Sequence, residues 1–358
     1  MSTLLRRINL RLIIALLIVL GCIWGVYAFQ PLTSTTQDAD EITVYTALPA
    51  DIVHGYLAAF QAEHPEIKVT LVNKVTLMIA DQLLAEQDDP QADVIWGLAV
   101  TSMLPLEWAH LLTLYAPVGI ARVGPTFRDV NEPPQWVGIA ARSVVFCVNT
   151  DELAKRKLPK PESWQDLLKP VYKGHLLILA PGQTSVGYLL ISTVLQMYGD
   201  TQGWEYLAQL NANADGHYAN QANGVCRLVR DGKYPIGITY DYRASFPKEK
   251  SMTIVIPKEG TGWDLEVNAL VRKESIKPAA KVFLDWAISD SAMQQYLHDR
   301  VITAATTDKY FSAGLSAEMV RKSLFDLDIP WIAANRERVQ GEWTELFGAP
   351  TDLIDTSK

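Results

Sequence analysis

Short β-type runs alternate with helical segments in the part of the chain that follows residue 40. Residues 42–46 (ITVYT), 67–72 and 92–96 (ADVIW) are strand-like, and residues 51–60 carry apolar side chains at helical spacing. Helices that connect consecutive strands produce a mainly parallel sheet covered on both faces. The sequence therefore predicts an α/β fold, in which a ligand binds at the carboxyl ends of the strands.

Two longer strand-like runs follow, at 137–149 (VGIAARSVVFCVN) and 263–271 (WDLEVNALV). We predict that they are crossover strands at the hinge between two lobes, for which 358 residues are ample. The predicted lobe 1 comprises residues 41–138 and about 262–300, lobe 2 comprises 139–261 and about 301–347, and 348–358 form a tail.

Residues 1–28 have the features of an export signal. Three arginines precede the uncharged apolar run 12–29, and the small residue Ala28 suits a cleavage site. Residues 29–40 are polar and would form a linker. Two alternatives stay open, because eighteen apolar residues can also anchor a chain in a membrane, and Cys22 ends a sequence that loosely resembles a lipobox. In each case the rest of the chain lies outside the cytoplasm, and we expect it in the periplasm.

The composition excludes several classes of function. Acidic side chains outnumber basic ones by 40 to 32, and no long Lys/Arg run is present, which argues against a nucleic-acid partner. The sequence has no Gly-x-Ser-x-Gly elbow, no Gly-rich phosphate loop with Lys-Ser/Thr and no His-Glu-x-x-His pair. The six histidines lack the spacing of a helical metal site. We expect a monomeric binding protein without catalytic activity, metal or cofactor.

The loop 181–188 leads from a strand into a helix and is a candidate anion site. Thr184 and Ser185 supply hydroxyl donors, and Gly187 allows a tight turn. The helix that follows would direct free N–H groups and its positive end at an anion. The alternative is an ordinary Ser/Thr helix cap.

A second candidate cluster, residues 240–243 (YDYR), follows a strand. Arg243 is suited to grip an oxyanion, and Asp241 to pair with a ligand ammonium group. The alternative is an Arg–Asp pair that ties down the loop.

Aromatic and acidic side chains occur at two further strand ends. Trp96 is a candidate aromatic wall or cation–π surface, although a tryptophan there also suits packing. Trp263 and Asp264 would place an aromatic ring and a carboxylate at the same cleft. Together with the anion candidates, these groups suit a small zwitterion.

Cys147 and Cys226 could form a disulfide in an exported protein. The bridge would close a loop of about 80 residues and stabilise the fold by about 4 kcal/mol. Alternatively, Cys147 is an unpaired residue buried in its apolar strand. Both interpretations stay open, because the sequence does not give the distance between the two Cα atoms.

Several segments resemble one family of proteins. They are ITVYTAL (42–48), LLAEQDDPQADVIWGLA (83–99), LPKPESWQDLLKPVYKGHL (158–176), KYPIGITYDYRA (233–244), PKEGTGWDLEVNALV (257–271) and PWIAANRERVQGEW (330–343). The chain resembles periplasmic substrate-binding proteins of ABC importers, in the branch that includes ferric-iron binders, and most nearly the 2-aminoethylphosphonate-binding subgroup. The resemblance implies a type II two-lobed periplasmic-binding-protein fold, a cleft that closes on the ligand, and delivery to a membrane permease.

The resemblance and the residue patterns together give the expected ligand-binding set. It comprises Tyr45, Ala47, Thr76, Trp96, Thr184, Ser185, Gly187, Tyr188, Tyr240, Asp241, Tyr242, Arg243, Trp263 and Asp264. The chain departs from the subgroup at two loops, since 73–78 keeps a hydroxyl only at Thr76 and 184–188 has lost one. We expect a small anionic or zwitterionic ligand such as 2-aminoethylphosphonate.

Two alternatives stay open. Ferric iron could be held by Tyr45, Tyr240 and Tyr242, although the adjacent Tyr-Tyr pair of ferric binders is absent. If the apolar run 12–29 is not cleaved, the chain could instead be a membrane-tethered sensor.

Cleavage of the export signal is directly testable. Amino-terminal sequencing of the exported protein should give Phe29 or Gln30 as the first residue, because the small residue Ala28 precedes that bond. An intact amino terminus on the exported protein would contradict cleavage and favour the anchor.

Overall fold

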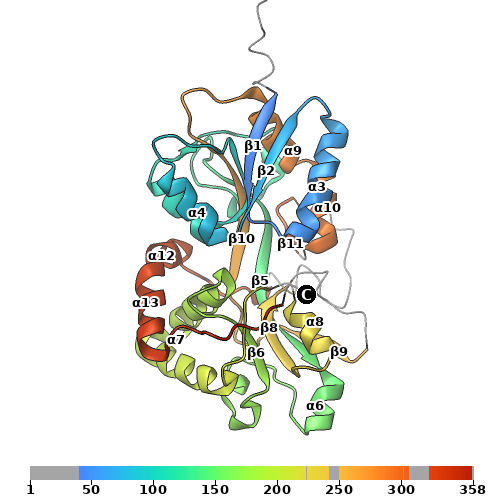
Figure 1. Cartoon of the computed structure of the whole chain (residues 1–358), viewed down its shortest axis with the longest axis vertical. Helices are drawn as coiled ribbons and strands as arrows, with labels where there is room; N and C mark the ends of the chain where they lie inside the picture. The colour runs from blue at the N-terminus through green and yellow to red at the C-terminus, as the bar shows by residue number, and fades with distance from the viewer. Residues whose placement is uncertain (1–39, 223, 242–249, 301, 306–321, 357–358) are drawn as a thin grey trace, which may run out of the picture. The chain divides into compact units, whose positions relative to one another are not determined.

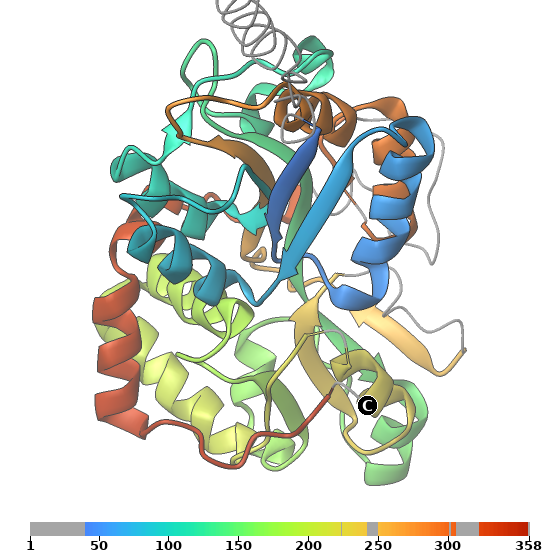
Figure 2. The same ribbon diagram turned by 45° about the horizontal axis from the view of Figure 1, so that its top comes forward.

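The structure is a computed structural model that describes residues 40–222, 224–241, 250–300, 302–305 and 322–356 (Figures 1 and 2). The predicted export signal, the apolar run 12–29 and the linker up to residue 39 lie outside the described residues, as do Tyr242 and Arg243. Among the residues it does describe, none belongs to a helix with the length and apolar character needed to cross a bilayer.

Strands and helices alternate along most of the described chain, which confirms the predicted α/β class. The strands are β1 (Glu41–Thr46), β2 (Lys68–Asn73), β3 (Val94–Ala99), β4 (Leu112–Thr113), β5 (Val137–Asn149), β6 (Leu176–Leu179), β7 (Tyr218–Ala219), β8 (Ile236–Tyr240), β9 (Met252–Val255), β10 (Trp263–Val271) and β11 (Ile302–Thr303). The α-helices are α3 (Ala50–Glu63), α4 (Thr76–Ala85), α5 (Val100–Trp108), α6 (Thr150–Arg156), α7 (Ser185–Ala214), α8 (Val225–Arg230), α9 (Pro278–Ala287), α10 (Asp290–Asp299), α12 (Ile329–Ala334) and α13 (Arg336–Phe347). Short 3-10 helices occupy Ile120–Arg122, Pro125–Phe127, Gln165–Leu168 and Pro170–Tyr172.

The strands follow the order β2-β1-β3-β10-β5-β8-β6-β7. The pairs β1–β2, β1–β3, β6–β7 and β6–β8 are parallel, whereas β10 is antiparallel to β3 and β5. Consecutive parallel strands are joined by helices, as the alternation in the sequence predicts. The carboxyl ends of β1 and β3 therefore share one edge, and those of β6, β7 and β8 share another.

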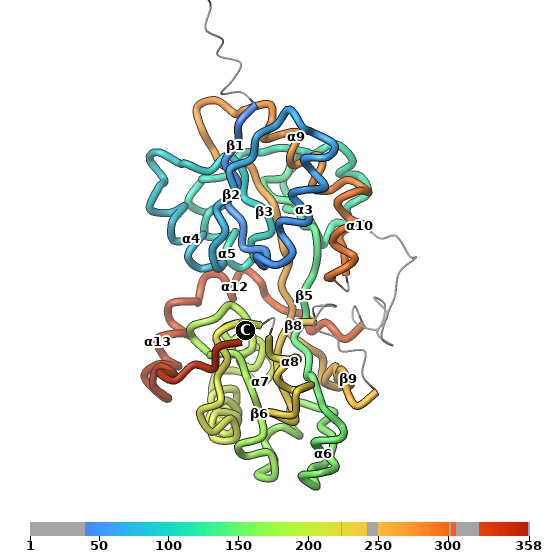
Figure 3. The backbone as a smooth tube through the Cα atoms, turned by 45° about the vertical axis from the view of Figure 1, so that its right-hand side comes forward, coloured from blue at the N-terminus to red at the C-terminus, as the bar shows by residue number. Residues whose placement is uncertain are grey.

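Strand β5 changes partners along its length. Residues up to Ser143 pair with β10, and residues from Val144 onward pair with β8 and β9. We call lobe 1 the part built on β1–β4, β10, β11 and the first part of β5, and lobe 2 the part built on β6–β9 and the rest of β5. Figure 3 follows the β5 backbone from one set of strands into the other.

Each lobe has its own apolar core. In lobe 1, α3 turns Tyr56 and Phe60 toward the sheet, because its apolar residues recur at helical spacing. In lobe 2, α7 is buried along its first turns and bends at Gly199, where φ is 75°. Cys147 of β5 and Cys226 of α8 are joined in a disulfide with their Cα atoms 5.5 Å apart, and both are fully buried.

Trp96 lies inside the lobe 1 core rather than at a ligand surface. Its side chain is 0% exposed, and its ring packs against Tyr56, Phe283 and Trp286. The indole Nε1 donates a hydrogen bond to Tyr296 Oη at 3.0 Å. The cation–π role expected for Trp96 does not fit this position, because side chains alternate along a strand and this one points into the helix layer.

Replacement of Trp96 by alanine should therefore reduce stability. We expect Trp96→Ala to lower the free energy of unfolding by about 3–5 kcal/mol, the usual cost of emptying a large core site. Urea unfolding followed by tryptophan fluorescence measures the change. Trp108→Ala, at a position that is 47% exposed, is the matched control and should cost much less. Equal costs for the two variants would contradict the core position of Trp96.

Candidate ligand-binding site

The carboxyl edge of lobe 2 brings three separate segments together. Strand β6 leads into the loop 180–184 and helix α7, β7 leads into residues 220–222, and β8 ends at Tyr240 and Asp241. Because β6 is parallel to both β7 and β8, all three segments lie at the same edge of the sheet. This edge is where the fold predicts ligand contacts.

The loop before α7 uses Thr184 as a helix cap. Thr184 Oγ1 accepts a hydrogen bond from Gly187 N at 3.0 Å and donates one to Ala180 O at 3.1 Å. The backbone oxygen of Thr184 accepts from Tyr188 N at 2.9 Å. The hydroxyl expected to bind the ligand is thus occupied within the loop, and the half-buried Ser185 is the remaining candidate from this hydroxyl pair.

Gly187 and Tyr188 are held by packing. A Cβ atom on Gly187 would lie 2.4 Å from the backbone oxygen of Ala180, so the close approach of helix and loop requires glycine. Tyr188 is 4% exposed, and its hydroxyl donates to the backbone oxygen of Ile332 in α12. Both residues support the loop by contacts within the protein.

Asp241 ties the end of β8 to β5. Its carboxylate accepts hydrogen bonds from the backbone N–H of Ser143 at 2.9 Å and from Ser143 Oγ at 2.7 Å. Burial raises the pKa of Asp241 to about 6, against the opposing effect of the two Ser143 donors. The carboxylate therefore faces inward to Ser143, and the ammonium-pairing role expected for it has no exposed oxygen to use.

Asp264 and Trp263 join neighbouring elements in the same way. Asp264 accepts from Thr101 Oγ1 at 2.7 Å and from Leu265 N at 2.8 Å, which fastens the first turn of α5 to β10. Burial raises the pKa of Asp264 as well. The half-buried Trp263 donates from Nε1 to the backbone oxygen of Phe325 at 2.8 Å.

Tyr45 and Tyr240 are buried tyrosines. Tyr45 Oη lies 3.0 Å from Glu86 Oε1 and accepts from Gln82 Nε2 at 2.7 Å. Burial is the largest cause that raises the pKa of Tyr45 to about 12. Tyr240 is 1% exposed, with the guanidinium of Arg142 4.6 Å from the centre of its ring. Neither side chain is exposed at the surface.

The lobe 1 edge carries Ala47 and Thr76. Ala47 is half-buried directly after β1, and Thr76 is buried as the first residue of α4. Val75 and Met78 beside it are 60% and 54% exposed, so this loop presents apolar side chains. Among the described residues, no group of three or more His, Cys, Asp or Glu side chains could hold a metal ion.

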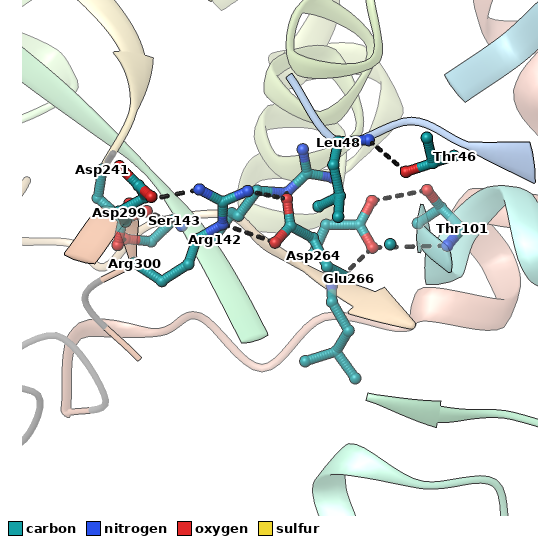
Figure 4. A network of polar contacts seen from close by, with 12 residues as sticks. Thr46, Leu48, Thr101, Arg142, Ser143, Asp241, Asp264, Glu266, Asp299 and Arg300 are labelled. Carbon is teal, nitrogen blue, oxygen red and sulfur yellow. Dashed lines mark hydrogen bonds and ion pairs between the residues drawn. The ribbon is translucent and has the colours of Figure 1, made fainter. Parts of the chain in front are cut away.

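A buried ionic cluster, missed in the sequence, lies where β5 changes partners (Figure 4). Arg300 donates to both oxygens of Glu266, from Nε at 2.6 Å and from a terminal nitrogen at 2.9 Å. Arg142 Nε lies 3.5 Å from Glu266 Oε1. All three residues are at most 5% exposed. The available signal was the presence of charged residues inside two largely apolar strands, Arg142 in β5 and Glu266 in β10.

The pH dependence of stability tests the environment of Asp241. Its raised pKa lets the folded state keep the proton up to about pH 6, whereas the unfolded state releases it near pH 4. The folded state thus binds more protons between these values, and the Asp241 contribution to the unfolding free energy falls as pH rises.

Asp241→Asn removes this titration. The unfolding free energy of the variant, relative to the parent, should rise by at most about 1.4 kcal/mol per pH unit between pH 4 and 6. Urea unfolding at several pH values measures the difference, with the exposed Asp352→Asn as control. Parallel pH curves for the parent and Asp241→Asn would contradict the raised pKa.

Comparisons with known proteins identify relatives of this chain. It is 29% identical over 201 residues to the Fe(3+)-binding periplasmic protein of Serratia marcescens. The aligned region is 56% of this chain and 57% of that protein. It is 27% identical over 270 residues, 72% of each chain, to a probable ABC transporter periplasmic-binding protein of Sinorhizobium fredii.

The fold is shared with solved structures. The periplasmic binding protein AfuA from Actinobacillus pleuropneumoniae, with exogenous fructose-6-phosphate bound, superposes with a TM-score of 0.75 at 22% identity, over 85% of this chain and 98% of that one. The sequence profile described as bacterial extracellular solute-binding protein matches residues 89–309. The chain therefore belongs to the bacterial extracellular solute-binding proteins, whose role is to bind a solute and not to catalyse a reaction.

Proposed function

We propose that this protein is the periplasmic receptor of an ABC importer, and that it binds a small anionic or zwitterionic solute such as 2-aminoethylphosphonate for delivery to a membrane permease. The observation that carries the ligand class is the amino-terminal end of α7. This end lies at the carboxyl edge of lobe 2, where ligands of parallel sheets bind.

The first turn of α7 is suited to an anion. The N–H groups of Gly187 and Tyr188 donate to Thr184, whereas those of Ser185 and Val186 precede the first intrahelical acceptors. The Ser185 hydroxyl is half-buried beside them. Two N–H groups, one hydroxyl and the positive end of a helix match the oxygens of a phosphonate or phosphate.

The buried carboxylates agree with an anionic rather than a cationic ligand. Asp241 and Asp264 each accept hydrogen bonds from the protein and are 2% exposed. Their oxygens are already used within the protein, so neither carboxylate is available to pair with a ligand cation. The ligand-facing candidates that remain among the described residues are mainly neutral donors.

The relatives support an oxyanion and offer one rival. AfuA was solved with fructose-6-phosphate, a phosphate ester. The Serratia marcescens relative is named for Fe(3+), so ferric iron is the second candidate ligand. The state of Tyr45 weighs against iron, because its hydroxyl is bonded to Glu86 and Gln82 and its pKa is raised to about 12. The third tyrosine of that set, Tyr242, lies outside the described residues.

A thermal-shift screen tests the ligand class. We expect phosphonates or phosphate esters to raise the melting temperature, because a ligand at a hundred times its Kd stabilises by about 2.7 kcal/mol. The screen should include esters with apolar substituents, since Val75 and Met78 are exposed beside the lobe 1 edge. A shift with ferric citrate alone, together with visible tyrosinate-to-iron absorption, would replace the phosphonate proposal by the iron one.

Substitution of Ser185 tests the site itself. Ser185→Ala should lower the affinity for the ligand found in the screen about tenfold, the usual effect of one lost hydrogen bond to a charged group. Ser291→Ala, which removes a hydroxyl from the first turn of α10, is the matched control and should leave the affinity unchanged. Equal affinities for both variants would remove Ser185 from the site.

A further inference from the structure

The last described residues of the chain form an additional strand-like segment on lobe 2. Residues 350–356, which we call the C-terminal strap, leave α13 and run across lobe 2 to end beside α8 (Figure 2). Ile354 forms a parallel bridge with Ala219 of β7. Ile354 N donates to Tyr218 O at 2.7 Å, and Asn220 N donates to Ile354 O at 3.2 Å. The strap thus covers the exposed edge of β7.

Thr356 fixes the strap to the segment that follows β7. Its hydroxyl donates to Gln221 O at 2.7 Å, and its backbone N–H donates to Asn220 Oδ1 at 3.1 Å. Its side chain is 2% exposed. A Cβ atom on Gly224 would lie 2.0 Å from Thr356 O, so this approach requires glycine.

The same C-terminal region also holds the loop before α7. Gln183 Nε2 donates to Pro350 O at 3.0 Å, at the start of the strap. Gln340 Nε2 of α13 donates to Gly182 O at 2.9 Å. Two of the three segments at the carboxyl edge of lobe 2, loop 181–184 and residues 220–222, are therefore bonded to residues 340–356.

We propose that the C-terminal strap positions the ligand-binding edge of lobe 2, with Thr356 as its main positioning residue. The inference rests on the proposed function, because it concerns the same edge. The strap bonds to Gln183 of loop 181–184 and to Asn220 and Gln221, so release of the strap removes bonds from both segments. The core of lobe 2 stays packed, since the strap adds only the partly buried Leu353 and Ile354 to it.

A competing explanation is that the strap merely protects an edge strand. β7 is a two-residue edge strand, and covering such an edge prevents unwanted pairing with other chains. That role predicts a change at β7 on removal of the strap and none at the loop before α7.

Hydrogen–deuterium exchange on the exported chain distinguishes the two. Three variants are compared with the parent: a chain that ends at Ala349, Thr356→Val, and Thr356→Ser, which keeps the hydroxyl. Peptides from 181–188 and from 218–222 should exchange faster in the truncated chain and, to a lesser degree, in Thr356→Val. Thr356→Ser should restore the parent rates, and Asp352→Ala, on the exposed side of the strap, should not change them.

Unchanged exchange at 181–188 in the truncated chain would overturn the proposal in favour of edge protection. If that chain does not fold, Thr356→Val and Thr356→Ser decide through peptides from 181–188, and equal rates there in both variants would overturn the proposal. Titration of the same variants with 2-aminoethylphosphonate should show about tenfold weaker binding by Thr356→Val. Failure of the parent to bind 2-aminoethylphosphonate would count against that ligand alone, because the exchange experiment needs no ligand.

Discussion

The buried pairing of Glu266 with Arg300 fastens β10 to the end of α10, beside β5, the strand that the two lobes share. It lies beside Arg142, next to the point where β5 exchanges β10 for β8 as its partner. Removing a charge from water costs free energy. The two hydrogen bonds from the Arg300 guanidinium to the Glu266 carboxylate offset part of that cost. Loss of either partner would leave a buried charge without its two-pronged counterion where β5, β10 and the end of α10 meet, a cost of about 3–5 kcal/mol.

In the same region, two carboxylates that were expected to bind a ligand instead accept hydrogen bonds from other parts of the protein. Asp241 binds Ser143 and Asp264 binds Thr101, and each pair joins two elements next to the ionic cluster. Once these carboxylates are engaged, the candidate groups at the lobe 2 edge are the first N–H groups of α7 and Ser185. A site built from neutral donors and a helix end favours an anion.

Local patterns predicted the elements well, and the roles of single residues less well. The strand at 137–149 agrees with the structure, because its apolar run is a local signal. A helix follows the loop as expected, but it begins at Ser185, inside the segment 181–188 that was expected to be the loop. Trp96 was expected at a ligand surface but lies in the core, since a strand end does not reveal which face its side chain takes. Arg142 and Glu266 were overlooked because each finds its counterion in another element, far away along the chain.

The sequence by itself determined the α/β class and the family, because both follow from the order of strand and helix signals and from contiguous motifs. It also supplied the two cysteines that the fold joins. Tertiary structure alone decided which hydroxyls and carboxylates stay available. Thr184 is used as a cap, Asp241 and Tyr45 are buried with partners, and Thr356 is anchored beside β7. Availability depends on hydrogen bonds between residues distant in the chain, and these exist only after the strands have paired.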